Sequence, residues 1–171
     1  RYLEVGVFFG ATFAMAMWEK EGRFLGIDTL SEFRLSELGT PDGGRLKVAL
    51  REQREQIQAV LATWGRGQAL FYEQDQLSVS PKLVKEKLEG GVNVFFYDGD
   101  HSAEATAAGI SHFAPAFDEE LVLLVDDYEG GEVRMGTQMG LSKTGYKVTE
   151  ELLYKGNTEV YMALLRKEVL A

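Results

Sequence analysis

The stretch that decides the fold is Tyr97-Asp98-Gly99-Asp100-His101-Ser102, which directly follows the apolar run at residues 92–96. A second apolar run, residues 121–125, also ends in acid, at Asp126-Asp127-Tyr128. Short runs of β-branched and aromatic residues bounded by Gly, Asp and Ser predict buried strands. Two such strands that end in carboxylates predict one polar site at the carboxyl edge of a sheet, where open α/β sheets bind their ligands.

The rest of the chain alternates strands with helices around this edge. Strands are expected at residues 3–5, 24–27, 69–72, 92–97, 121–125, 146–154 and 159–165. Helices are expected at residues 11–21, 45–63, 80–88, 102–113 and 130–141, and residues 31–44 form a polar connection with a turn at 41–44. Alternation favours a parallel sheet with helices on both faces, and Gly156-Asn157 suits a final hairpin. We predict an α/β, Rossmann-like, doubly wound and mostly parallel seven-stranded sheet of order 3-2-1-4-5-7-6, with strand 7 antiparallel.

Composition indicates one ordinary globular domain over residues 1–171. Apolar residues make up 45% and charged residues 26% of the chain. The formal net charge of −9 argues against non-specific binding to nucleic acid or to an anionic membrane. The chain has no cysteine, which excludes disulfides, thiol nucleophiles and cysteine-ligated zinc. No apolar run is long enough for a membrane span and no signal peptide is visible, and we expect a cytoplasmic protein. The sequence starts without Met and inside an expected strand, so we also expect helical residues upstream of Arg1.

A glycine-rich turn follows the first expected strand. Glu4, Gly6 and Gly10 lie between that strand and a helix, where glycine lets the backbone pass close to a ligand and the helix N-terminus adds a positive end. Asp28 ends the next strand, where an acid can accept hydrogen bonds from ribose hydroxyls. The turn lacks the pattern G-x-G-x-x-G, which counts against NAD or FAD. The plain alternative is a structural turn followed by an Asp that caps a loop.

Taken together, these motifs resemble those of the class I S-adenosylmethionine-dependent methyltransferases over almost the whole chain. More narrowly, the chain is similar to small-molecule O-methyltransferases related to the catechol and macrolide-sugar enzymes. The resemblance implies that the cofactor is S-adenosylmethionine. The residues that it assigns to cofactor binding are Glu4, Gly6 and Gly10 at the methionine end, Asp28 at the ribose, Asp75 near the adenine, and Asp98.

The same resemblance implies a divalent metal ion, with Mg²⁺ expected, on Asp98, Asp126 and Asp127. Two positions depart from the catechol enzymes: His101 stands where they have Lys, and Asp127 where they have Asn. A hydroxyl nucleophile must lose a proton, so we expect Asp98 and His101 to be catalytic, with His101 as the base. The plain alternatives are a solvated turn at Asp126-Asp127 and a helix-start role for His101. His112, inside the following helix, is interpreted as structural.

These observations favour a methyltransferase that acts on a hydroxyl of a small molecule. Two alternatives stay open: a non-catalytic S-adenosylmethionine-binding or scaffold protein of the same fold, and a nicotinamide-dependent oxidoreductase. The expected partner is the small-molecule acceptor, with a homo-oligomer as an open alternative. Neither nucleic acid nor membrane is expected as a partner.

Overall fold

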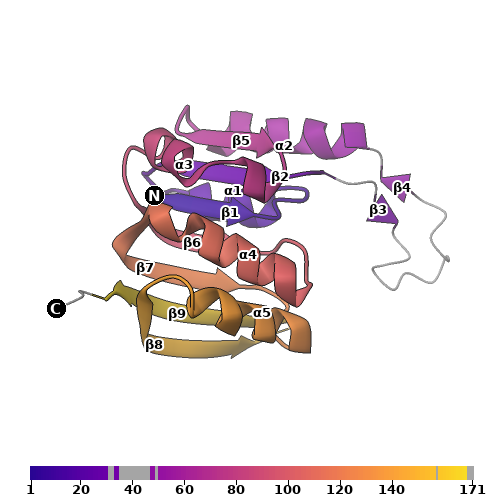
Figure 1. Ribbon diagram of the computed structural model, residues 1–171. Helices are drawn as coiled ribbons and strands as arrows, with labels where there is room; N and C mark the ends of the chain where they lie inside the picture. The colour runs from indigo at the N-terminus through magenta and orange to yellow at the C-terminus, as the bar shows by residue number, and fades with distance from the viewer. Residues whose placement is uncertain (31–32, 35–46, 49, 157, 169–171) are drawn as a thin grey trace.

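The computed structural model describes residues 1–30, 33–34, 47–48, 50–156 and 158–168, and it contains a seven-stranded sheet in the order β5-β2-β1-β6-β7-β9-β8 (Figure 1). β9 runs antiparallel to both β7 and β8, whereas the other neighbouring strands are parallel. This confirms the predicted order 3-2-1-4-5-7-6 with an antiparallel last strand. The strands are β1 (Tyr2–Val5), β2 (Phe24–Asp28), β5 (Ala69–Glu73), β6 (Val92–Tyr97), β7 (Phe117–Val125), β8 (Tyr146–Lys155) and β9 (Glu159–Lys167).

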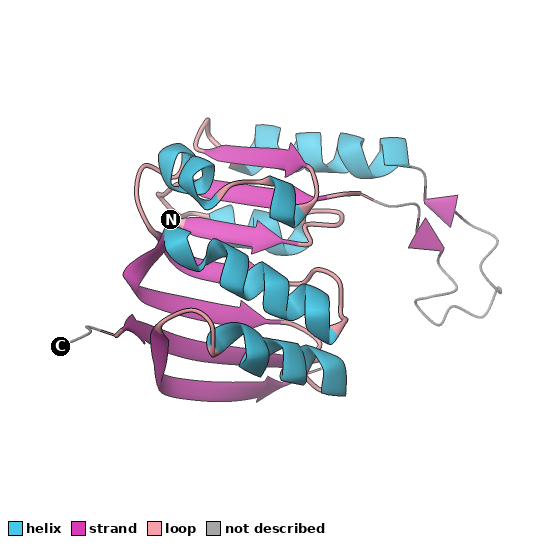
Figure 2. Ribbon diagram, viewed as in Figure 1, coloured by secondary structure: helices cyan, strands magenta, loops and turns pink. Residues whose placement is uncertain are grey.

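Helices cover both faces of the sheet (Figure 2). One face carries α1 (Ala11–Met17) and α2 (Leu50–Trp64), and the other carries α3 (Pro81–Lys87), α4 (Ala103–Phe113) and α5 (Gly131–Leu141). Short 3-10 turns, η2 (Gln76–Ser78) and η3 (Ala114–Ala116), follow β5 and α4. Among the described residues, no helix combines the length and the apolarity that a membrane crossing requires.

Each face has its own hydrophobic core. Under α1 and α2, Phe13, Met17 and Ile57 are almost fully buried. On the opposite face, the core is larger and includes Phe95 and Phe113, whose rings pack edge to face 5.9 Å apart. The chain's two tryptophans, Trp18 and Trp64, meet at the outer ends of α1 and α2 with ring centroids 6.1 Å apart.

Serine side chains cap α3 and α4 at their N-termini. The Ser80 hydroxyl accepts a hydrogen bond from the Leu83 N–H at the start of α3, and Ser102 does the same for the Ala105 N–H at the start of α4. Each hydroxyl satisfies one of the N–H groups that a helix leaves unpaired in its first turn. The cap at Ser102 fixes where α4 begins, directly after the stretch that carries Asp98 and His101.

Two predicted helix boundaries are wrong. α1 ends at Met17 and not at residue 21, because Trp18 is extended and Glu19 adopts a positive φ of 53°, so the chain leaves the helix before Gly22. α2 begins at Leu50 and not at residue 45, because the backbone at Lys47–Val48 forms β4, which pairs with β3 (Phe33–Arg34). The predicted turn at residues 41–44 and most of the connection at 31–44 lie outside the described residues.

The carboxyl ends of β1, β6 and β7 are level and joined by backbone hydrogen bonds. Val5 is in register with Tyr97, and Tyr97 with Val125. The ladder continues one residue beyond the strands, since the Asp98 N–H donates to the Val5 carbonyl (2.8 Å) and the Asp126 N–H donates to the Tyr97 carbonyl (3.1 Å). The residues that follow each strand are therefore delivered to one edge of the sheet.

At this edge, Gly6 lies directly against the backbone of Asp98. Its φ is +88°, and a Cβ atom added there would lie 1.8 Å from the Asp98 carbonyl oxygen. Both the backbone conformation and the space therefore require glycine. The glycine turn after β1 and the acidic turn after β6 fit together only because this position has no side chain.

We predict that Gly6→Ala lowers the free energy of unfolding by roughly 2–4 kcal/mol, the sum of a left-handed backbone penalty and an overpacking cost. Urea denaturation measures the change. Gly131→Ala is the matched control, because a Cβ at Gly131 would meet no atom within 4 Å. Equal stability of the two variants would contradict the close approach of Gly6 to Asp98.

Candidate functional site

Three side chains converge at the carboxyl edge of the sheet: Asp98, His101 and Asp127. Each offers one ligand atom, and these atoms all lie within 4.8 Å of one another. The His101 Nε2 atom is 3.4 Å from Asp127 Oδ2 and 3.7 Å from Asp98 Oδ1. The structure thus brings together two of the three predicted metal-ligating acids with the predicted base.

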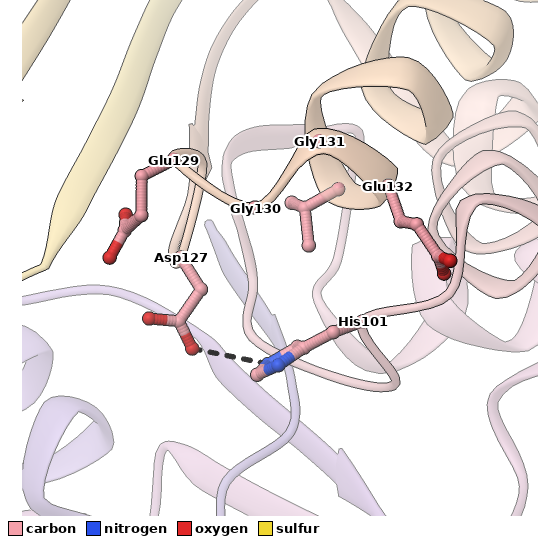
Figure 3. A pocket seen from close by; sticks show the side chains of 7 residues that line it. His101, Asp127, Glu129, Gly130, Gly131 and Glu132 are labelled. Carbon is pink, nitrogen blue, oxygen red and sulfur yellow. Dashed lines mark ion pairs between the residues drawn. The ribbon is translucent and has the colours of Figure 1, made fainter.

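Asp126 holds a different position from its neighbour. Its Oδ1 atom accepts hydrogen bonds from the Asp127 N–H and from the Thr158 hydroxyl, both at 2.9 Å. Thr158 precedes β9, so Asp126 ties the end of β7 to the turn between β8 and β9. Asp127 has a positive φ of 51°, a conformation that Asp tolerates better than most residues, and its carboxylate lies beside His101 (Figure 3).

The cluster is rich in negative charge. Burial raises the pKa of Asp98, and the Asp126 and Asp127 carboxylates raise it further, whereas His101 lowers it. Burial is also the largest cause of the raised pKa of Asp127. The pKa of His101 is raised chiefly by the Asp98 carboxylate. These directions agree with one another, because carboxylates placed close together favour protons or cations near them.

A cavity of about 310 Å³ opens beside His101 and Asp127 (Figure 3). Its other wall is the turn into α5, at Glu129, Gly130 and Gly131. Two consecutive glycines after a strand-end acid leave the backbone of this wall without side chains. The cavity places open space next to the only histidine of the cluster.

The predicted cofactor residues Gly10 and Asp28 lie around the turn after β1. Gly10 caps α1 with a φ of +81°, so the helix N-terminus begins at the turn. The Asp28 carboxylate accepts hydrogen bonds from the Phe8 N–H (2.7 Å) and the Leu30 N–H (2.8 Å). Asp28 therefore fixes the glycine turn in place, and its assignment to the ribose stays a prediction.

Glu4 is fully buried beneath this turn. Its two carboxylate oxygens accept hydrogen bonds from the Tyr2 and Thr12 hydroxyls, both at 2.6 Å. Burial raises the pKa of Glu4 to about 7, against the lowering effect of the two hydroxyls. The sequence did not reveal Tyr2 and Thr12 as partners, although a buried acid in a strand requires such donors. Glu4 links β1 to α1, and its contact with the cofactor stays a prediction.

The structure also shows the positions of Asp75 and His112. Asp75 caps η2 after β5, at the same edge of the sheet, and its side chain accepts a hydrogen bond from the Leu77 N–H. Its contact with adenine stays a prediction. The His112 Nε2 atom lies 2.9 Å from the Val79 carbonyl oxygen, as expected for a histidine with a structural role.

The fold defined by this sheet order is that of the class I S-adenosylmethionine-dependent methyltransferases. No protein-family model matches the chain, and no curated protein matches it in sequence. Among solved structures, TomG from Streptomyces achromogenes, an O-methyltransferase of tomaymycin synthesis solved with S-adenosylmethionine, has a TM-score of 0.64 at 16% identity. That match covers 98% of this chain and 73% of TomG.

Two further solved structures show how widely this fold is used. The calicheamicin methyltransferase CalS11 has a TM-score of 0.58 at 19% identity, over 96% of this chain and 71% of its own. The ribosomal protein L11 methylase from Lactobacillus delbrueckii subsp. bulgaricus has a TM-score of 0.55 at 13% identity, over 98% of this chain and 69% of its own. At such identities the likeness concerns the fold, and the names include both small-molecule and protein methylation.

We predict that Glu4 makes stability fall as pH rises. Its folded pKa of about 7 exceeds the ordinary 4.5, so the folded state keeps a proton that the unfolded chain has released between those values. The contribution of Glu4 to the free energy of unfolding should fall by about 3 kcal/mol between pH 4.5 and 7 and change no further above pH 7. Urea denaturation across this range should show a weaker slope for Glu4→Gln, and parallel curves for the two proteins would contradict the prediction.

Proposed function

We propose that the protein is an S-adenosylmethionine-dependent methyltransferase that methylates a hydroxyl of a small molecule with the help of a divalent cation. The observation that carries the proposal is the cluster of Asp98, His101 and Asp127 at the carboxyl edge of a methyltransferase-type sheet. S-adenosylmethionine would supply the methyl group from a positively charged sulfonium. The chain's own residues would then position the acceptor and manage its proton.

The cofactor end of the proposal relies on the turn after β1. The turn from Gly6 to Gly10 leads directly into the α1 N-terminus, and both glycines have positive φ values, so the turn can fold tightly there. Asp28 ends the next strand beside this turn, and its carboxylate, which accepts hydrogen bonds from the Phe8 and Leu30 N–H groups, would also accept them from ribose hydroxyls. The solved neighbour TomG, which is in complex with S-adenosylmethionine, supports the choice of cofactor.

The acceptor end relies on the cluster and its cavity. Carboxylates and imidazole are groups that accept a proton or hold a cation, and a cation lowers the pKa of a nearby hydroxyl. The donor set of Asp98 and Asp127 fits a divalent ion such as the expected Mg²⁺. The cavity of about 310 Å³ beside His101 and Asp127 has the size of a small-molecule pocket, which favours a small acceptor.

Asp28 provides a direct test of the cofactor assignment. We predict that Asp28→Ala weakens S-adenosylmethionine binding by roughly 1–3 kcal/mol, because hydrogen bonds to a charged acceptor are lost. Isothermal titration calorimetry measures the affinity. Asp118→Ala is the control, since Asp118 lies near the start of β7, at the other edge of the sheet.

The same calorimeter separates the competing functions. S-adenosylmethionine should bind and NAD should not, and the reverse result would favour an oxidoreductase. Unchanged affinity in Asp28→Ala would remove Asp28 from the cofactor site. Tight binding of S-adenosylmethionine without methyl transfer to any hydroxylated acceptor would favour a non-catalytic binding protein.

A further inference from the structure

We propose that His101 is a metal ligand together with Asp98 and Asp127, and that the site takes a first-row transition ion such as Mn²⁺ in preference to Mg²⁺. The proposal deepens the proposed function, on which it rests, by naming the ion and giving His101 a role other than that of a free base. It concerns binding, so the ion itself can test it without a known acceptor.

The first argument is the spacing of the donor atoms. His101 Nε2 lies 3.4 Å from Asp127 Oδ2 and 3.7 Å from Asp98 Oδ1. Both distances exceed the donor–acceptor distance of a charged hydrogen bond, which is about 2.7–2.9 Å. Ligands that each lie about 2.1 Å from one ion are about 3.0–3.4 Å from each other. The distances from His101 are close to that range, and the three ligand atoms all lie within 4.8 Å of one another, so rotations of the side chains would bring them around one cation.

The second argument is charge. Asp98, Asp126 and Asp127 lie directly after β6 and β7, at one edge of the sheet. In the part of the chain that the structure describes, no Lys or Arg forms an ion pair with any of them. Asp98 and Asp127 face the imidazole and Asp126 lies close by, so the cluster keeps excess negative charge even when the imidazole is protonated. A divalent cation would compensate this charge from within the cluster.

The third argument is the chemistry of the donors. Mg²⁺ prefers oxygen ligands in near-octahedral geometry, whereas imidazole suits later first-row ions. Asp126, which an all-carboxylate site would recruit, already accepts hydrogen bonds from Asp127 and Thr158 through Oδ1. The donor atoms that the structure brings together are one imidazole nitrogen and two carboxylate oxygens. Three protein ligands beside a cavity also leave positions open for an acceptor oxygen, which is typical of catalytic metal sites.

The small number of histidines lets an experiment identify the nitrogen ligand. The chain has only two histidines and no cysteine, so a nitrogen ligand from an imidazole must be His101 or His112. His112 lies within α4 and contacts the Val79 carbonyl, away from the cluster. His112→Gln is therefore the matched control for His101→Gln, and the protein must carry no histidine tag.

The experiment titrates the chelator-stripped, untagged protein with Mn²⁺ and with Mg²⁺ by calorimetry, and records pulsed electron paramagnetic resonance of the Mn²⁺ complex. We expect Mn²⁺ to bind at least about tenfold more tightly than Mg²⁺, following the general order of affinities. Modulation of the Mn²⁺ signal by a coordinated imidazole nitrogen should be present in the unmodified protein and in His112→Gln, and absent in His101→Gln. His101→Gln should also lose about tenfold or more in Mn²⁺ affinity, since even indirect partners of a metal ligand contribute about that much.

Three results would overturn the proposal: no binding of Mn²⁺, bound Mn²⁺ without nitrogen modulation, or equal affinities for Mn²⁺ and Mg²⁺. Circular dichroism of His101→Gln checks that its fold is kept, which is expected because its side chain is 53% exposed. A parallel titration with S-adenosylmethionine tests the methyltransferase proposal separately from the metal-site proposal. Cofactor binding without a histidine-ligated ion would leave the methyltransferase proposal standing, whereas a histidine-ligated ion without cofactor binding would overturn the methyltransferase proposal alone.

Discussion

The contact of Gly6 with the Asp98 backbone is the constraint on which the site depends. It joins the turn after β1, which carries the cofactor assignment, to the turn after β6, which carries the acidic cluster. The hydrogen bonds that Asp98 and Asp126 donate across the strand ends hold the same edge level. Two stretches some ninety residues apart in sequence therefore form one surface, and the chemistry of each is available to the other.

Most of the fold could be predicted from the sequence because its elements differ in pattern. The buried strands are short apolar runs that end in acid or glycine, and the serine caps at Ser80 and Ser102 mark helix starts that the structure confirms. The two wrong helix boundaries fall where the sequence pattern is helical but the backbone conformation is not. Residues typical of helices continue past Met17, but Glu19 adopts a positive φ and the chain leaves the helix there. A glutamate in the sequence gives no signal of a positive φ. The charged residues before α2 are equally compatible with a helix and with the small ribbon of β3 and β4.

The site was predictable in location and less so in detail. Strand-end acids place Asp98, Asp126 and Asp127 at one edge, since parallel strands share their carboxyl ends. An Asp-Asp pair does not reveal which carboxylate points into the site. The structure separates them by backbone conformation: Asp127 is left-handed and lies beside His101, whereas Asp126 bonds to Thr158. The same holds for Glu4, whose partners are set by how α1 packs on β1.

The pairing of Trp18 with Trp64 gives this protein a built-in optical reporter. The rings are 6.1 Å apart and they are the only indoles of the chain, so their electronic transitions couple and should produce an exciton band in circular dichroism. Trp18 follows directly on α1, the helix that begins at the glycine turn, and Trp64 ends α2. The band therefore monitors the packing of these two helices without any label, and a ligand that moves α1 would change its intensity.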